Sequence, residues 1–392
     1  MRTASQEVAE EFGVSVRSVR RLFAHFHELG QDGIAPDYEQ CGANHPDKTP
    51  EALRVKVLQV RHEHPTWGAP LVRVMMRRER PQREWPSART MQRWFRQAGL
   101  APAPAGRRPA CDADRADQPH QIWQMDAKEQ MTLATGSRAC WLRVVDEFSG
   151  AVLQTFAFAR GSFTALGPWV VQNKLCAVLA RWGRPGAFRV DNGAPWGSRG
   201  DLPTDLALWL IGLEIDMIWN PPRQPQCNGV VERSQGVGAS WTEPHTCRSV
   251  RELQARLRKM DRIQREEYPH VAGKSRMAAY PKLKHAGRNY SIAWEKKHWN
   301  FSRVAEHLAG YGITRRVDRC GKVSLYERPY YVGAHYAGER VYVCFDPEEL
   351  QWIFSLEDGT EIRSRPAIEI TRTRIRRLDV TNRRNSHLRR PK

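Results

Sequence analysis

Ile122-Trp123-Gln124-Met125-Asp126 is an apolar run that ends on a carboxylate, a pattern typical of a short buried strand that stops at a sheet edge. The run Phe188-Arg189-Val190-Asp191 has the same form, and Asn192-Gly193 after it predicts a turn that frees the carboxylate. A third acid, Glu232, begins a helix-like stretch. Two strand-end aspartates and one helical glutamate predict that three carboxylates meet at one edge of a sheet.

Three carboxylates that come together repel one another unless a divalent cation neutralises them. Hard oxygen ligands in this number suit Mg²⁺ or Mn²⁺. The alternative is that three ordinary acids lie at the ends of strands and helices, and for any one of them alone it is the better explanation. The three contexts together favour a metal site, with Asp126, Asp191 and Glu232 as the candidate catalytic residues and metal ligands.

The composition indicates a protein that binds a polyanion. A length of 392 residues predicts two to four domains, and a net charge of +19 with a pI near 10.0 favours nucleic acid as the partner. No apolar run is long enough to predict a membrane span, and the first residues lack the apolar core of a signal peptide, so the expected location is cytoplasmic. The eight cysteines include no Cys-x-x-Cys pair, which favours neither a disulfide framework nor a zinc site.

A helix-turn-helix unit is predicted in the first domain, residues 1–48. Apolar residues recur there at helical spacing, Gly13 provides a tight turn, and Ser15 is suited to cap the second helix. The outer face of that helix would present arginines to the major groove of DNA. They are Arg17, Arg20 and Arg21. The alternative is a basic helical hairpin that serves only for packing.

A second unit of the same kind is predicted at 49–100. Three helical segments with apolar faces follow one another there, and Ser87 is suited to cap the third. The outer face of the third helix would carry Arg89, Arg93 and Arg96. Two successive units predict that a bipartite DNA site is bound. Residues 101–118, which follow, are rich in proline and alanine and predict a linker.

The central part of the chain, residues 119–247, has the pattern of a mixed α/β layer. Strand-like segments come first and then alternate with helix-like ones, which favours a sheet with antiparallel and parallel parts. The expected strands are 122–126, 141–146, 151–159, 187–191 and 215–219, with helices at 163–182 and 202–212.

Three segments complete the chain. Residues 248–311 predict a helical connector whose apolar stripe packs on its own domain rather than on a partner. Residues 312–370 alternate like strands, with Asp358-Gly359 as a hairpin turn, and predict a small closed β-barrel. The tail, 371–392, holds eight Arg and one Lys against one Asp, and predicts a segment that becomes ordered only on a phosphate backbone.

Three strings carry a resemblance to a known family: Trp123-Gln-Met-Asp126, Asp191-Asn-Gly193 and, at 220–233, Asn-Pro-Pro-Arg-Gln-Pro-Gln-Cys-Asn-Gly-Val-Val-Glu-Arg. They resemble the signature of DDE-type bacterial insertion-sequence transposases, which share the catalytic core of retroviral integrases. The resemblance is strong over about 119–240. It extends more weakly to the helical units and to the C-terminal barrel, which is similar to that of Mu-type transposases.

The resemblance implies a multidomain α/β chain in which helix-turn-helix units precede a ribonuclease-H-like mixed-sheet core and a small β-barrel. In that core Asp126, Asp191 and Glu232 would be the triad that holds two Mg²⁺ or Mn²⁺ ions, with Asp126 bridging them. Asp146 matches a family position that is usually not a ligand, and Arg233 is a candidate for contact with phosphate. The chain lacks the His/Cys zinc module of retroviral integrases, so no zinc is expected.

The function that the resemblance implies is a DNA transposase that binds transposon ends and performs metal-dependent strand cleavage and strand transfer. Its expected partners are double-stranded DNA, as terminal repeats and as target, and further copies of itself on that DNA, at the nucleoid of a bacterial cytoplasm. Two other functions stay open. One is a DNA-binding regulator with an inactive core, and the other is a ribonuclease-H-like nuclease that acts on RNA.

Overall fold

The computed structural model describes residues 4–34, 49–101, 114–197, 202–221, 224–384 and 386–390. Most of the predicted linker 101–118 therefore lies outside the described residues. No helix within the described ranges is both long enough and apolar enough to cross a membrane.

The N-terminal unit is a pair of helices, α1 (Ala4–Glu11) and α2 (Val16–Leu29), followed by the 3₁₀ turn η1 (Gly30–Gly33). Gly13, in the turn between the helices, has a φ of +64°, which glycine adopts without strain. Ser15 accepts a hydrogen bond from the backbone N–H of Ser18 and caps α2, as the sequence predicts. The helical character of this unit is confirmed, whereas its assignment as a helix-turn-helix stays a prediction.

The second unit consists of three helices, α3 (Glu51–Glu63), α4 (Ala69–Glu79) and α5 (Ala88–Gln97). Ser87 accepts a hydrogen bond from the backbone N–H of Thr90 and caps α5, again as predicted. Met91, Trp94 and Phe95 of α5 are buried, so the apolar side of this helix is the one that the sequence indicates. Here too the helices are confirmed and the DNA-binding motif is not.

A mixed sheet of five strands forms the central domain, in the order β3-β2-β1-β4-β5. The strands β1, β2 and β3 form an antiparallel meander, and β4 and β5 run parallel to β1. This confirms the mixed α/β layer that the sequence predicts. The bounds are β1 (Ile122–Thr132), β2 (Arg138–Asp146), β3 (Val152–Phe158), β4 (Ala187–Val190) and β5 (Asp216–Trp219).

The first strand is longer than the sequence predicts. The apolar run ends at Asp126, but β1 continues to Thr132 because it pairs with β2 along the whole hairpin. Asp126 therefore lies inside a strand, opposite Arg143 of β2, and not at a strand end. Asp191 follows β4 directly, so its predicted place at a strand end is confirmed.

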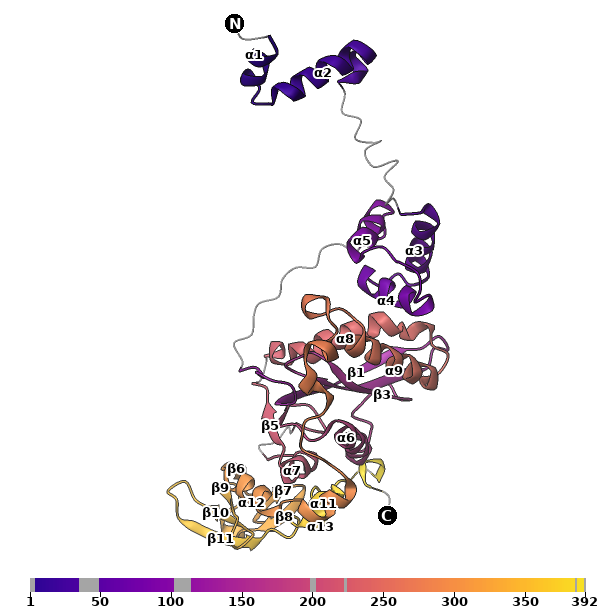
Figure 1. The fold of residues 1–392 in the computed structure, drawn as a ribbon. Coiled ribbons are helices and arrows are strands. Elements are labelled where there is room, and N and C mark those ends of the chain that lie inside the picture. Colours follow the sequence, from indigo (N-terminus) through magenta and orange to yellow (C-terminus); the bar gives the residue numbers. More distant parts are fainter. Residues whose placement is uncertain are drawn as a thin grey trace.

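Helices cover both faces of the sheet (Figure 1). One face carries α6 (Pro168–Trp182) and α7 (Asp205–Gly212), and the other carries α8 (Gly229–Thr242) and α9 (Val250–Glu266). Side chains alternate along β1, so Trp123 and Met125 enter the core shared with α6 and α7, whereas Gln124 contacts the first turn of α8. This alternation places Gln124 and Asp126 on the α8 side of the sheet.

The second helical unit is docked on α8 and α9. Its buried residues share one apolar cluster with Trp241 of α8 and with Met260 and Ile263 of α9. Polar contacts support the docking, since Trp67 Nε1 donates to the backbone carbonyl of Trp241 at 3.2 Å and Thr66 Oγ1 donates to that of Ser240 at 2.6 Å. Figure 1 shows α3–α5 directly beside α8.

The C-terminal strands form an open sheet, which corrects the predicted closed barrel. β6 (Ile313–Arg316), β9 (Arg340–Asp346), β10 (Gln351–Ser355) and β11 (Glu361–Pro366) pair in the order β11-β10-β9-β6. β7 (Lys322–Leu325) and β8 (Arg328–Tyr331) form a separate two-stranded sheet. Alternation along the sequence predicts strands, but it does not decide whether the outer strands of a sheet meet. The preceding helices are α10 (Arg276–Ala279), α11 (Ile292–His298) and α12 (Phe301–Ala309).

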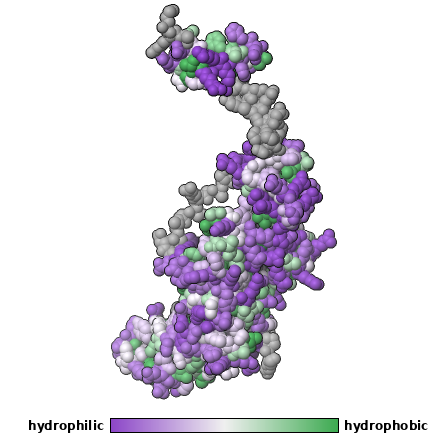
Figure 2. Space-filling view, in the orientation of Figure 1, coloured by the Kyte–Doolittle hydropathy of each residue, from purple (hydrophilic) through white to green (hydrophobic). Residues whose placement is uncertain are grey.

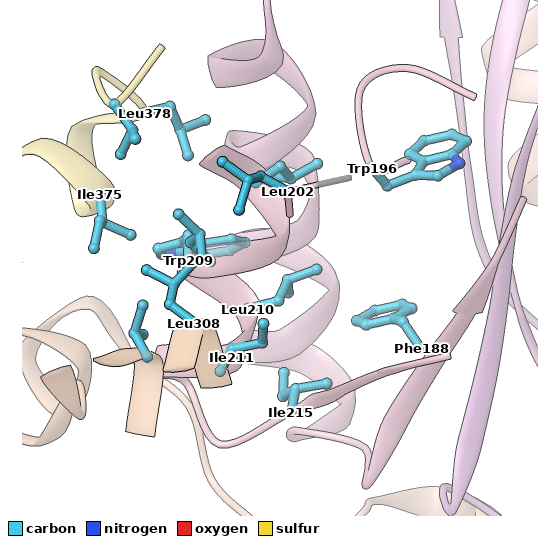
Figure 3. Packing of buried hydrophobic residues seen from close by; sticks show 14 of the residues in the cluster. Phe188, Trp196, Leu202, Trp209, Leu210, Ile211, Ile215, Leu308, Ile375 and Leu378 are labelled. Carbon is cyan, nitrogen blue, oxygen red and sulfur yellow. The ribbon is translucent and has the colours of Figure 1, made fainter. Parts of the chain in front are cut away.

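The basic tail also differs from the prediction, because its first part is folded. The helix α13 (Arg372–Arg377) buries Ile375, and Leu378 and Val380 beyond it are buried as well. Figure 3 shows Ile375 and Leu378 beside Trp209 of α7, in the same cluster that reaches Phe188 of β4. These three apolar side chains pack the segment onto the central domain, and hydrogen bonds to the buried Asp205 of α7 attach it further.

Candidate active site

Asp126 and Asp191 lie at the same level on neighbouring parallel strands. Gln124 of β1 is opposite Arg189 of β4. The same register, continued for two residues, brings Asp126 level with Asp191. Neighbouring strands are about 4.8 Å apart and residues at one level point to the same face. The two aspartates therefore approach each other on the α8 side of the sheet.

Glu232 lies on that same side, because two contacts fix the first turns of α8 against β1. The backbone N–H of Val231 donates to Gln124 Oε1 at 2.9 Å. Gln235 Nε2 donates to the backbone carbonyl of Asp126 at 3.1 Å and to its Oδ2 at 3.5 Å. Glu232 is between these two anchors on the helix. The structure thus places the three acids on one side of the sheet, whereas the prediction that they meet within reach of a shared cation stays a prediction.

The charges of these acids act on one another. The pKa of Asp126 is raised from 3.8 to about 6, first by burial and then by the negative charges of Asp191 and Glu232. Hydrogen bonds from the Ala127 N–H and from Gln235 oppose this rise. Both other acids of the proposed triad are therefore close enough to Asp126 to disfavour its charged form.

The Asp191 carboxylate is held by neighbours on its own loop. Trp196 Nε1 donates to Asp191 Oδ1 at 2.6 Å, and the backbone N–H of Gly193 donates to the same oxygen at 3.1 Å. Trp196 is buried in the core, as Figure 3 shows, so its indole anchors the carboxylate rigidly. These two contacts orient the Asp191 carboxylate through its Oδ1.

The acids are gathered on one face but they do not form a ready-made ligand shell. Among the residues that the structure describes, no three His, Cys, Asp or Glu side chains lie close enough together to hold a metal ion. The three groups suit Mg²⁺ or Mn²⁺ because all of them are hard carboxylate ligands. A bound cation would also lower the raised pKa of Asp126, because it favours the charged carboxylate. A cation would have to draw the three side chains together.

A buried carboxylate beneath the aspartates, Glu147, is the main feature that sequence reasoning missed. Its Oε2 accepts hydrogen bonds from Gln124 Nε2 at 2.6 Å and from Arg189 Nε at 2.8 Å. Each of these partners stands two residues before one of the aspartates. Glu147 thus ties β1 to β4 directly below the candidate site. The sequence gives one indication of this contact, which is that a polar residue, Gln124 or Arg189, stands two positions before each aspartate.

Asp146, the neighbour of Glu147, has a structural role. Its Oδ1 accepts hydrogen bonds from the backbone N–H and the hydroxyl of Ser149, and its Oδ2 accepts one from the backbone N–H of His120. The carboxylate is fully buried in these contacts. It closes the turn after β2 and stands apart from the three candidate acids in function.

The seven arginines predicted to contact DNA are all exposed. Three lie on α2, three on α5, and one follows Glu232 on α8: Arg17, Arg20, Arg21, Arg89, Arg93, Arg96 and Arg233. Exposure is required for contact with a phosphate but does not establish it, so these residues stay predictions.

One part of the chain matches a known protein family. Residues 308–362, from the end of α12 into β11, match the family model of the Mu transposase C-terminal domain. This segment is therefore similar to the C-terminal domain of Mu transposase. The matched segment lies next to a central domain that places three carboxylates on one face of a mixed sheet.

Solved structures of retroviral integrases show a weaker likeness. The HTLV-2 integrase catalytic core domain in complex with magnesium is 19% identical over 44% of this chain and 100% of its own, with a TM-score of 0.32. The BIV integrase catalytic core domain is 18% identical over 43% of this chain and 97% of its own, with a TM-score of 0.33. The simian T-cell lymphotropic virus intasome in complex with PP2A regulatory subunit B56 gamma is 16% identical over 72% of this chain and 89% of its own, with a TM-score of 0.36. Because these scores are low, the chemistry of this chain is argued below from its own residues.

Proposed function

We propose that this transposase-like protein cuts and joins DNA strands at a metal-dependent site formed by Asp126, Asp191 and Glu232. The observation that supports this most is the raised pKa of Asp126, to which both other acids contribute, on the side of the sheet that α8 covers. Three carboxylates with this mutual repulsion are stabilised when they share a divalent cation. The proposal includes a ribonuclease-H-like core at 119–247, one of the seven segments predicted from the sequence.

The chain supplies ligands and their orientation. Two Mg²⁺ or Mn²⁺ ions, when bound, would activate the attacking oxygen and stabilise the leaving oxygen of a phosphodiester. Asp126 and Asp191 would hold the ions from the strand side of the site, and Glu232 would hold them from the helix side. Gln235 and Trp196 fix one oxygen each of the two aspartates before DNA arrives. This preorganisation is the protein's own contribution to catalysis.

The reaction is a displacement at phosphorus. In the first step a water oxygen attacks the phosphodiester at the transposon end, a new P–O bond forms, and the 3′ oxygen of the strand leaves as a hydroxyl. In the second step that 3′-hydroxyl attacks a target phosphodiester, so the number of phosphodiester bonds is unchanged. Neither step needs an oxidant, a reductant or a nucleotide cofactor.

Positive charge would hold the DNA. A net charge of +19 and exposed arginines on α2, α5 and α8 suit a long phosphate backbone. We propose that the arginines of the two N-terminal units bind the terminal repeats and that Arg233 contacts a phosphate next to Glu232. Binding of this type weakens steeply as the salt concentration rises.

The test is strand cleavage by Asp191→Asn. We expect this variant to bind a duplex that carries the transposon end with wild-type affinity and to lose Mn²⁺-dependent nicking of it almost completely. The matched control is Asp216→Asn, which removes an exposed acid on β5 and should nick normally. Wild-type nicking by Asp191→Asn would contradict the proposed site.

A DNA-binding regulator with an inactive core is the second candidate, because the three acids are not assembled into a ligand shell. The two functions differ in a direct measurement of Mn²⁺ binding to the protein–DNA complex. Binding that Asp191→Asn abolishes supports the enzyme. DNA binding without any uptake of Mn²⁺ by the wild-type complex supports the regulator.

A further inference from the structure

The N-terminal helical pair exposes an unusually apolar surface. We call it the N-terminal apolar face and define it by seven side chains that are each at least 43% exposed: Phe12, Val14, Leu22, Phe23, Phe26, Leu29 and Ile34. They make up nearly half of the exposed large apolar side chains in the described residues, although this unit contains only residues 4–34. Figure 2 shows green, hydrophobic side chains gathered on it. A groove of about 520 Å³ runs along the face.

The spacing along α2 is that of a helix that pairs with another helix. Val19, Leu22, Phe26 and Leu29 follow one another at intervals of three, four and three residues, as the two core positions of a heptad repeat do. Val19 is buried against α1, while the other three remain exposed. We call these four positions of α2 the seam. Within one chain, α1 covers only the first of them, Val19.

The charged residues of α2 leave this seam free. In the same heptad, Arg17, Arg20 and Arg21 occupy positions on the side away from the core positions. The flanking positions are held by Val16, Ser18, Phe23 and His25. None of these is a Lys, Arg, Asp or Glu, so two copies of α2 could pair without bringing like charges together. A partner seated on the apolar face would not cover the three arginines.

The size of the face fits an interface between two proteins. A fully exposed phenylalanine side chain presents about 200 Å², so the exposed parts of the seven residues together present roughly 600 Å². A standard interface buries about 800 Å² on each partner. A patch this large is unusual on a monomer, and a unit of this length is too small to bury a core of its own.

The neighbouring sequence offers little to cover the face from within the chain. Residues 35–48, which follow the unit, contain Tyr38 as their only large apolar or aromatic side chain. This single side chain cannot cover a face of seven apolar side chains. A second copy of the same face, in contrast, matches it in area, in apolar character and in heptad spacing.

We propose that the N-terminal apolar face is a dimer interface, at which the α1–α2 pairs of two chains pack into a bundle of four helices. The contact is isologous, so each seam buries the other. Each dimer then displays two sets of the α2 arginines on its outer surface. The proposal does not depend on the cleavage chemistry, since it concerns assembly in the absence of DNA and metal.

The test is self-association of the full chain, measured by sedimentation equilibrium without DNA. We expect the seam variant Leu22→Glu/Phe26→Glu to raise the dissociation constant at least tenfold, because it places charges in an apolar interface. The matched control is Ala24→Glu on the same helix, at an exposed position outside the seam, which should associate like the wild type.

A second variant distinguishes weakened association from unfolding of the α1–α2 pair. Leu29→Glu changes the last seam residue, which is 64% exposed and therefore contributes little to the fold of one chain. It too should weaken association while the helical circular dichroism stays unchanged. A wild-type chain that is monomeric, or seam variants that associate as tightly as Ala24→Glu, would overturn the proposal. In that event another segment of the chain or a different protein covers the face.

Discussion

The charged form of the Asp126 side chain is disfavoured in the metal-free protein relative to its protonated form. Its pKa of about 6 lies well above the usual 3.8, because burial and the charges of Asp191 and Glu232 disfavour ionisation. In the unfolded chain none of these influences acts. The folded protein therefore binds the Asp126 proton more tightly than the unfolded one, and the resulting stabilisation of the fold is fully present below about pH 4. The stabilisation is lost as the pH rises through 6.

We predict that Asp126→Asn makes the metal-free protein more stable at neutral pH. An uncharged amide removes the repulsion, and a shift of about two pKa units corresponds to a gain on the order of 1–3 kcal/mol in the free energy of unfolding. The gain should shrink as the pH falls below 6 and vanish only well below about pH 4, where Asp126 is protonated in the folded and the unfolded protein alike. Denaturant unfolding in EDTA at pH 4.5 and pH 7.5 measures both values.

The control for this experiment is Asp117→Asn, which changes an exposed acid and should leave the stability at both pH values nearly unchanged. A stability gain for Asp126→Asn that is equal at the two pH values would show that removal of charge is not its cause. A loss at pH 7.5 would contradict the electrostatic account.

At the scale of residues, the sequence predicts the acids but not what holds them. Asp126, Asp191 and Glu232 each stand in a local context that marks them, because apolar runs and an Asn-Gly turn are visible in one dimension. Glu147 stands in no such context. Its importance comes from Gln124 and Arg189, which reach it only when β1 and β4 lie side by side.

At the scale of elements, α8 is positioned by a buried arginine. Arg143 of β2, the cross-strand neighbour of Asp126, donates from Nη1 to the backbone carbonyl of Ser234 at 2.6 Å and from Nη2 to Asp261 of α9 at 3.2 Å. Burial lowers the pKa of Arg143 and raises that of Asp261, as expected for a pair removed from water. Gly238 lets the guanidinium lie against the backbone of α8.

We predict opposite effects for two glycine substitutions in α8. Gly238→Ala would place a Cβ on the Arg143 guanidinium, which is fully buried and cannot move aside, so it should destabilise the protein by about 1–3 kcal/mol. Gly236→Ala has open space around its Cβ and should stabilise the helix by about 0.5–1 kcal/mol. Thermal unfolding of the two variants compares them directly.

The same comparison also bears on the site. If Arg143 positions the helix that carries Glu232, Gly238→Ala should weaken Mn²⁺ binding while Gly236→Ala leaves it unchanged. Equal stability of the two variants would mean that Arg143 is not held as firmly as its contacts indicate.

Elements were predicted well where their cause is local. The caps at Ser15 and Ser87 and the apolar faces of α2 and α5 are properties of a few consecutive residues, and all are confirmed. The predicted end of β1 at Asp126 is wrong, because pairing with β2 in the hairpin extends the strand to Thr132. The closed barrel was also wrong, since the closure of a sheet depends on where distant strands lie.

At the scale of the whole molecule, the C-terminal tail completes the core. Asp205 at the start of α7 is fully buried, and its carboxylate accepts hydrogen bonds from the backbone N–H of Val380 at 3.1 Å and from Thr381 Oγ1 at 2.5 Å. Arg383 forms an ion pair with it at 3.1 Å. Without the tail, this charge would be buried without partners.

We predict that removal of residues 372–392 strongly destabilises the chain. It strips three apolar side chains from the core and leaves Asp205 unpaired, which together should cost about 3 kcal/mol or more. Differential scanning fluorimetry should show a markedly lower melting temperature. A shorter truncation that removes only residues 386–392 keeps all these contacts and should melt like the full chain. Equal melting of both truncations would restore the expectation of a tail that is not part of the fold.

The sequence by itself determined the chemistry that this chain offers: three acids in marked contexts, a strongly basic composition, capped helices and a mixed α/β layer. These are local properties, set by neighbouring residues and by total charge. Only the tertiary structure decided that the acids share one face of the sheet, that Glu147 and Arg143 support them, that the tail folds and that the C-terminal sheet is open. Each of these depends on contacts between residues far apart in the chain, which burial and strand pairing create and which no local pattern encodes.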